Sequence, residues 1–194
     1  MNKSRVEAFS DGVFAIIITI MVLEIKVPQG TDWQAIKPLL PVLSSYVLSF
    51  LFVAIYWGNH HHLLHTVKSV NSGIIWANIN LLFWLSLIPV ATGWMGANHF
   101  AINTIIVYAV LLLINGIAFT ILQRAVMYTN PHNTQLAEAF EQLKIKGYIS
   151  LVCYTAAIPL AFVSTVISGI LFLTVSIMWL VPDKNIERAL KEKE

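Results

Sequence analysis

The sequence predicts an all-α membrane protein that crosses the bilayer with six helices. Of its 194 residues, 57% are apolar and only 11% are charged, and the mean hydropathy is +0.73. In soluble domains about a quarter of the residues are charged, so this chain has too few charged residues to cover the surface of a water-soluble globule. Long uncharged stretches separate the few charges, and a membrane-crossing helix needs about 20 mostly apolar residues. We therefore expect one polytopic domain over residues 1–194.

The first predicted span covers residues 4–25. Its apolar run, Gly12–Leu23, is about 18 Å long at the helical rise, which is too short to cross a bilayer. Basic residues precede it, as in a secretory signal peptide, but the segment that follows offers no small-x-small cleavage site. We therefore expect one longer helix that contains Ser10 and Asp11.

The other charges divide the rest of the chain into five more spans. The uncharged stretch Ser69–Gln123 is long enough for two spans, with Pro89, Gly93 and Gly96 marking the break between them. The uncharged stretch at the C-terminal side holds most of two tightly connected spans. The predicted spans are residues 38–62, 72–94, 100–124, 140–162 and 164–182, followed by a cytoplasmic tail over residues 183–194.

The distribution of lysine and arginine predicts the orientation. With a cytoplasmic N-terminus, all but two of the 12 basic residues lie on the cytoplasmic side, and only Lys26 and Lys37 lie outside. Because cytoplasmic loops carry an excess of Lys and Arg, we expect a cell-membrane protein with both termini in the cytoplasm.

Composition also argues against several function classes. A single cysteine, Cys153, excludes a disulfide scaffold and a cysteine-rich zinc site. The net charge of +2 is spread over loops, so there is no nucleic-acid footprint. No convincing nucleophile, acid–base pair or metal set is present, so we expect neither an enzyme nor a cofactor.

The first helix carries the most informative residues. On a helical wheel, one stripe contains Gly12, Ile16, Thr19, Ile20 and Leu23, whereas Ser10 and Asp11 lie elsewhere, near the cytoplasmic end. The spacing of the stripe alone fits ordinary packing against lipid or neighbouring helices.

An ionisable residue inside a membrane helix is a candidate functional site, and Asp11 is the strongest one here. For Ser10 and Asp11 we favour a polar cluster that holds helices in register, because a buried carboxylate needs donors around it. Candidate donors are Trp57, Asn59, the histidines of the second span, Asn78 and Asn80.

A histidine-rich run, Asn59–His65, ends the second span. His61 and His65 have the i, i+4 spacing of zinc-binding pairs, but no acidic residue accompanies them. A metal site and a pH-sensing role remain alternatives. We favour hydrogen bonding of one or two of these rings to the Ser10–Asp11 cluster, with Trp57 on the same face as His61.

The N-terminal residues also carry a motif. Arg5-Val-Glu-Ala-Phe9-Ser10-Asp11-Gly12 fits R-x-x-x-F-S-D-G at the start of a first helix. It resembles the prokaryotic relatives of the lysosomal potassium channel called transmembrane protein 175. The six-span layout and the histidine-rich end of the second span extend the resemblance over the chain. Animal members carry two such repeats, so one repeat implies a homotetramer.

The resemblance implies a K⁺-preferring cation channel without a conventional selectivity-filter loop, whose pore is lined by the first helices. It implies apolar constrictions at Ile16 and Leu23, a selectivity role for Thr19, and pore-lining positions at Gly12 and Ile20. The expected partners are further copies of the chain, the lipid bilayer, and permeant K⁺ and other monovalent cations. The residues expected in a structural network around the motif are Arg5, Phe9, Ser10, Asp11, Trp57, His61 and Asn78.

One alternative function stays open at this point. A secondary transporter could use Asp11 as a proton or cation site, although the sequence shows no internal repeat of the kind that transporters often contain.

Overall fold

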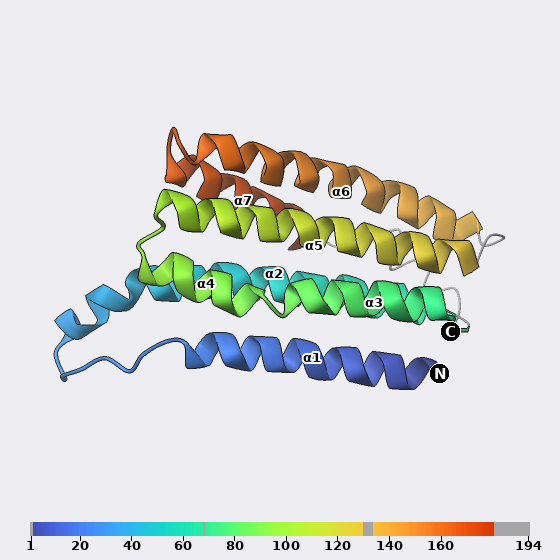
Figure 1. Ribbon diagram of the computed structural model, residues 1–194, viewed down its shortest axis with the longest axis horizontal. Coiled ribbons are helices and arrows are strands. Elements are labelled where there is room, and N and C mark those ends of the chain that lie inside the picture. The colour runs from blue at the N-terminus through green and yellow to red at the C-terminus, as the bar shows by residue number, and fades with distance from the viewer. Residues whose placement is uncertain (1, 68, 130–133, 181–194) are drawn as a thin grey trace.

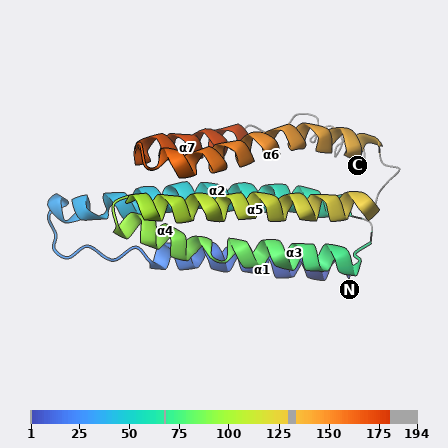
Figure 2. The same ribbon diagram turned by 45° about the horizontal axis from the view of Figure 1, so that its top comes forward.

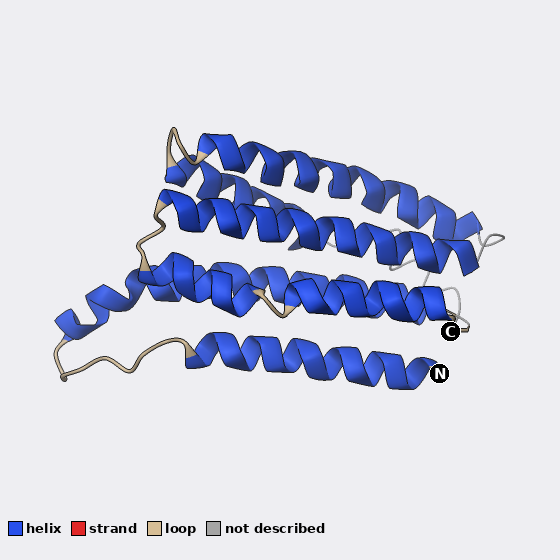
Figure 3. Cartoon of the chain, in the orientation of Figure 1, coloured by secondary structure: helices blue, strands red, loops and turns tan. Residues whose placement is uncertain are grey.

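The computed structural model describes residues 2–67, 69–129 and 134–180, and every regular element among them is a helix. Side chains are described for these residues except 134–142. No strand occurs among them, as Figure 3 shows. The elements are α1 (Lys3–Leu23), a 3-10 helix η1 (Trp33–Leu39), α2 (Leu40–His65), α3 (Ser72–Leu85), α4 (Ile88–Ala97), α5 (Ile102–Thr129), α6 (Thr134–Leu160) and α7 (Thr165–Leu180).

The helices run alongside one another and form three layers (Figures 1 and 2). α1 packs on α2, α3 and α4. α2 packs on α4, and both α3 and α4 pack on α5. α6 covers α5 on the far side and pairs with α7. The all-α prediction is therefore confirmed.

Four helical stretches among the described residues are long and apolar enough to cross a membrane. They are Lys3–Leu23, Trp33–His65, Ser72–Ala97 and Ile102–Thr129, and the apolar helix Thr165–Leu180 is shorter. A helix also lies at each predicted position, although α5 continues past residue 124 and α6 begins before residue 140. The predicted turn at residues 130–133 and the tail at residues 183–194 lie outside the described residues.

The third predicted span is a pair of helices rather than one kinked helix. Ser86 and Leu87 separate α3 from α4, and Pro89 occupies the first turn of α4. Proline has no backbone N–H to donate to the preceding turn and favours the start of a helix. The sequence-based assignment of Pro89 to the connection between spans was wrong, because the interruption lies within the third span.

The chain reverses after α4. His99 and Phe100 adopt left-handed backbone conformations, with φ of 51° and 58°, and the Phe100 N–H donates to the Met95 carbonyl at 3.0 Å. Gly93 and Gly96 therefore lie inside α4 and not in the turn, which corrects the prediction.

Gly96 allows α4 to approach α2 closely. A Cβ at this position would lie 2.8 Å from Cα of Val42 and would also overlap the Ser45 hydroxyl. Farther along the same helices, the Thr92 hydroxyl donates to Ser49 Oγ at 2.7 Å, and Ser49 bonds the Tyr108 hydroxyl at 2.8 Å. Small and polar residues thus fix the register of α2, α4 and α5.

Candidate functional site

The first helix has one face buried in its own bundle. Val6, Ser10, Phe14, Ile17 and Met21 are the buried residues of α1, and their spacing of three or four residues places them on one side of the helix. This face packs against α2, α3 and α4.

The opposite face of α1 is exposed although it is largely apolar. It carries the five residues of the predicted stripe, Gly12, Ile16, Thr19, Ile20 and Leu23, all of them exposed. Ile16 is 58% exposed and Leu23 is 80% exposed. The stripe predicted from the helical wheel is therefore the face of α1 that points away from the rest of the chain.

Thr19 is the one residue of this stripe with a side-chain hydroxyl. Its Oγ1 donates a hydrogen bond to the Ile16 carbonyl at 2.9 Å. Because the hydroxyl proton points back into the helix, the lone pairs of the oxygen remain available on the exposed side. The residue can therefore act as an acceptor or as a cation ligand.

A buried polar cluster joins α1, α2 and α3. The Ser10 hydroxyl donates to the Val6 carbonyl at 2.8 Å and accepts from Nδ2 of Asn78 at 3.0 Å. Oδ1 of Asn78 bonds Nε2 of His60 at 2.6 Å. Since an amide oxygen only accepts, Nε2 of His60 is the donor. Ser10 and Asn78 are thus found together, as expected.

The histidine that bonds Asn78 in this cluster is His60 and not His61, which contacts the predicted network only through Trp57. His60 is 2% exposed, whereas His61 is exposed and stacks on Trp57 with the ring centres 5.9 Å apart. His60 follows the buried Val53 by seven residues, which is two helical turns, so it shares the buried face of α2. Trp57 and His61 do share one face, as their spacing indicated.

Asp11 lies at the edge of this cluster and not inside it. It is exposed, and its Oδ1 accepts a hydrogen bond from the Trp57 indole N–H at 2.9 Å. This contact ties α1 to α2 on the side where the indole also stacks on His61. The expected pairing of Asp11 with Trp57 is present, but the carboxylate is not buried in the chain itself.

Within the single chain, Arg5 and Phe9 lie outside the polar contacts of this network, so their place in it stays a prediction. Both are exposed, and the Arg5 side chain makes no hydrogen bond or ion pair with the described residues. They precede Gly12 and Ile16 by seven residues each, so they extend the exposed stripe toward the N-terminal end of α1.

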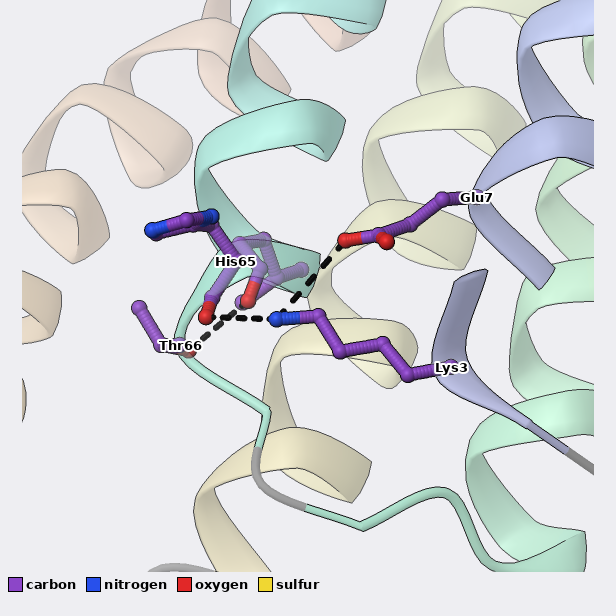
Figure 4. A network of polar contacts seen from close by, with 5 residues as sticks. Lys3, Glu7, His65 and Thr66 are labelled. Atoms are coloured by element: carbon purple, nitrogen blue, oxygen red, sulfur yellow. Dashed lines mark hydrogen bonds and ion pairs between the residues drawn. The ribbon is translucent and has the colours of Figure 1, made fainter. Parts of the chain in front are cut away.

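A second contact between α1 and α2 could not be expected from the sequence. The Lys3 ammonium donates to the His65 carbonyl at 2.8 Å and lies 3.7 Å from Oε1 of Glu7, as Figure 4 shows. The last carbonyls of a helix lack intrahelical partners, and a cation there is favourable. Lys3 thereby caps the end of α2. The i, i+4 spacing of Lys3 and Glu7 was the only sequence signal.

The histidine run has no metal-binding geometry in the part of the chain that is described. No group of three or more His, Cys, Asp or Glu side chains lies close enough there to hold a metal ion. His61 and His65 instead stack with a ring-centre distance of 6.3 Å.

The profile of a family described as the endosomal/lysosomal potassium channel TMEM175 matches residues 5–89. A potassium channel from Chryseobacterium sp. (strain P1-3) is 50% identical over 192 residues, which cover 99% of this chain and 100% of that protein. The chain belongs to the TMEM175 family. A potassium channel from Streptomyces collinus is 34% identical over 84% of this chain and 85% of its own length. The resemblance drawn from the motif is therefore confirmed.

Two further TMEM175 relatives are informative. A crystal structure of a lysosomal potassium-selective channel TMEM175 homologue from Chamaesiphon minutus superimposes with a TM-score of 0.75 at 26% identity, covering 92% of this chain and 96% of that one. The mouse endosomal/lysosomal proton channel TMEM175 is 34% identical over 47% of this chain, which corresponds to 21% of its own length. The chain is thus a helical membrane protein of the TMEM175 fold.

Proposed function

We propose that this chain forms a K⁺-preferring cation channel as a homotetramer, with the first helices around a central pore. The observation that carries the proposal is the exposed apolar stripe of α1, which its own bundle leaves uncovered over the length of the helix. The prokaryotic relatives named above are potassium channels. Family membership and the predicted single six-span repeat support the tetramer.

Two apolar rings close the proposed pore. Ile16 and Leu23 are seven residues apart on one face, which places their rings about 10.5 Å apart along the axis. A hydrated cation cannot shed its water in a narrow apolar ring, so each ring closes the pore by dewetting. Gly12 and Ile20 line the pore on either side of the Ile16 ring. Opening requires the rings to widen or rotate away.

A layer of hydroxyl oxygens lies between these rings. Thr19 follows Ile16 by about 4.5 Å along the helix, and the inward bond of its proton to the Ile16 carbonyl presents the oxygen lone pairs to the pore. Four such oxygens replace part of the hydration shell of K⁺. They are weaker and fewer than a ladder of carbonyls, so the expected selectivity is modest.

The proposed setting is the cell membrane, with both termini in the cytoplasm. The ends of α1 and α5 near Lys3 and Arg124, the end of α2 at His65 and the start of α3 lie at the same end of the bundle in Figure 1. Placing this end inside satisfies the excess of basic residues on cytoplasmic loops.

A proton- or cation-coupled transporter is the second candidate, and one observation favours it. The break at Ser86–Leu87 produces a discontinuous helix, a feature that transporters use to bind ions near the midplane. However, the break and the first turn of α4 contain no ionisable residue. The carboxylate proposed from the sequence, Asp11, is on another helix and is bonded to Trp57. The channel therefore accounts for more of the geometry.

Flux from the purified protein in liposomes distinguishes the two functions. A channel dissipates a K⁺ diffusion potential without a pH gradient, whereas a transporter moves K⁺ only with stoichiometric proton movement. Thr19→Ala should lower the preference for K⁺ over Na⁺ while conduction survives, and unchanged selectivity would remove Thr19 from the filter. The mass of the assembly in detergent tests the tetramer.

A further inference from the structure

A groove lies between α5 and α6, away from α2, α3 and α4, the helices on which α1 packs. Its volume is about 680 Å³, and it is lined toward one end by Arg124 and Lys144 and toward the other by Ile117, Ile121 and Leu151. Arg124, Lys144, Ile117 and Ile121 are exposed, so the groove is open to the surroundings of the bundle. It is thus amphipathic along its length.

The two cations lie at the same height on adjacent antiparallel helices. A Cβ at Gly116 would lie 3.1 Å from the Leu151 side chain, which fixes the register of α5 against α6. Toward the α5–α6 connection, Arg124 lies eight residues after Gly116 on α5, and Lys144 lies seven residues before Leu151 on α6. Along the helix axes, Arg124 therefore lies about 12 Å and Lys144 about 10.5 Å from the level of that contact.

This height corresponds to the edge of a bilayer. α5 has 28 residues and is about 42 Å long, whereas the hydrocarbon core is about 30 Å thick. A centred helix extends about 6 Å beyond the core at each end, and Arg124 is about 7.5 Å from the end of α5. Its guanidinium can therefore reach the level of the lipid phosphates.

Among the described residues, no carboxylate forms an ion pair with Arg124. A cation at the membrane boundary is stabilised by an anion in contact, and a basic pocket between membrane helices recognises anionic lipid headgroups. Next to it, Ile117, Ile121 and Leu151 offer an apolar wall of about one and a half helical turns, which an acyl chain can contact.

Gly147 keeps the groove open. It lines the groove between Lys144 and Leu151, and a Cβ built at this position meets nothing within 4 Å. A larger side chain can therefore enter the groove without displacing the protein. This position allows the space to be filled while both cations remain in place.

We propose that the α5–α6 groove is a binding site for one anionic phospholipid per chain, with the phosphate between Arg124 and Lys144 and an acyl chain along Ile117, Ile121 and Leu151. The site depends on the membrane setting of the family and not on the proposed pore, so a failure of either proposal leaves the other standing.

The test is native mass spectrometry of the purified full chain in detergent, titrated with phosphatidylglycerol or phosphatidylcholine of the same acyl chains. We expect phosphatidylglycerol to bind more tightly than phosphatidylcholine. Because a cation near the surface contributes a factor of about five to the binding of an anionic lipid, Arg124→Gln and Lys144→Gln should each weaken phosphatidylglycerol binding about fivefold. Arg124→Lys should retain most of it.

Gly147→Leu should block the groove and reduce the binding of both lipids. Gly169→Leu, at another position where a Cβ meets nothing within 4 Å, and Lys146→Gln, two residues from Lys144 but outside the lining, serve as matched controls and should bind like the native chain.

Three results would overturn the proposal. The first is equal affinity for the two lipids in the native chain, or native binding of phosphatidylglycerol in the Arg124, Lys144 and Gly147 variants. The second is displacement of the lipid by glycerol phosphate alone, which would make the site a phosphate site without an acyl chain. The third is a changed assembly mass in Gly147→Leu, which would place a second copy in the groove.

Discussion

Ile16 and Ile17 are neighbours of the same residue type that α1 turns in different directions. Ile16 is 58% exposed and Ile17 is 2% exposed. Ile17→Ala leaves a cavity against α2, α3 and α4 and should lower the free energy of unfolding by about 2–5 kcal/mol. Ile16→Ala removes the same three carbons. At about 0.8 kcal/mol for each carbon, scaled by the buried fraction of Ile16, it should lower the free energy of unfolding by about 1 kcal/mol.

The effect on ion flux should be the reverse. If four copies of Ile16 form the constriction, alanine widens it and lowers the barrier to ion entry. A decrease of about 1.4 kcal/mol raises the resting K⁺ flux tenfold, and we expect at least this increase. Ile17→Ala should not change the flux of the protein that remains folded.

The assay is K⁺ flux from liposomes, normalised to the folded protein recovered after reconstitution, with thermal unfolding in detergent measured in parallel. A leak in Ile17→Ala but not in Ile16→Ala would refute the assignment of the stripe to the pore. So would a loss of stability in Ile16→Ala as large as that in Ile17→Ala, because Ile16 would then be a packed core residue.

Three further substitutions test the packing and the polar contacts around α1. Gly96→Ala should lower the free energy of unfolding by about 1–3 kcal/mol, because the added carbon overlaps the backbone of α2; thermal unfolding in detergent measures it. Asn78→Leu should cost about 1–3 kcal/mol in the same assay, because the buried His60 loses its acceptor. Trp57→Phe should change stability by less than about 1 kcal/mol, because the bond to Asp11 is exposed; cysteine cross-linking of α1 to α2 should show a looser contact.

Matched residues provide the controls for these three substitutions. Gly169→Ala should be neutral or slightly stabilising, since a Cβ there has open space. Asn59→Leu should be milder than Asn78→Leu, since Asn59 donates only to the Ile55 carbonyl of its own helix. Trp76→Phe, on an exposed surface of α3, should leave the α1–α2 cross-link unchanged. Equal losses in a variant and its control would contradict the corresponding contact.

The exposed stripe of α1 was predictable because helical geometry is periodic. The spacing of Gly12, Ile16, Thr19, Ile20 and Leu23 placed them on one side, and the structure turns this side away from the bundle. The wheel alone could not say whether lipid, water or another copy covers the stripe, since all of these fit an apolar surface. The pore assignment therefore depends on the family and on the predictions above.

The histidine of the buried cluster was missed for a different reason. A run of adjacent histidines presents a ring on every side of the helix, so residue type does not identify the buried one. The signal lay in the flanking apolar residues, because Val53 and His60 are two turns apart and Leu64 continues the same face. The Lys3 contact with the end of α2 had no such signal, since it depends on how two helix ends meet in space.

The interruption within the third span shows the limit of a hydropathy pattern. The residues around Pro89 are apolar on both sides, so the pattern continues across the break. Proline predicted a local disturbance but not its size, which depends on whether neighbouring helices support a continuous axis.

The layered order of the helices has a consequence for communication across the molecule. α1 packs on α2, α3 and α4, whereas α6 packs on α5 and α7 and lies in the layer farthest from α1 (Figure 2). The groove with Arg124 and Lys144 lies between α5 and α6. A disturbance there reaches α1 through the intervening helices. Because Gly96 allows α4 to pack closely on α2, we expect these two helices to move together as one unit. A small tilt of α5 and α6 would therefore tilt α1 as well, and would not loosen the packing of α1 locally.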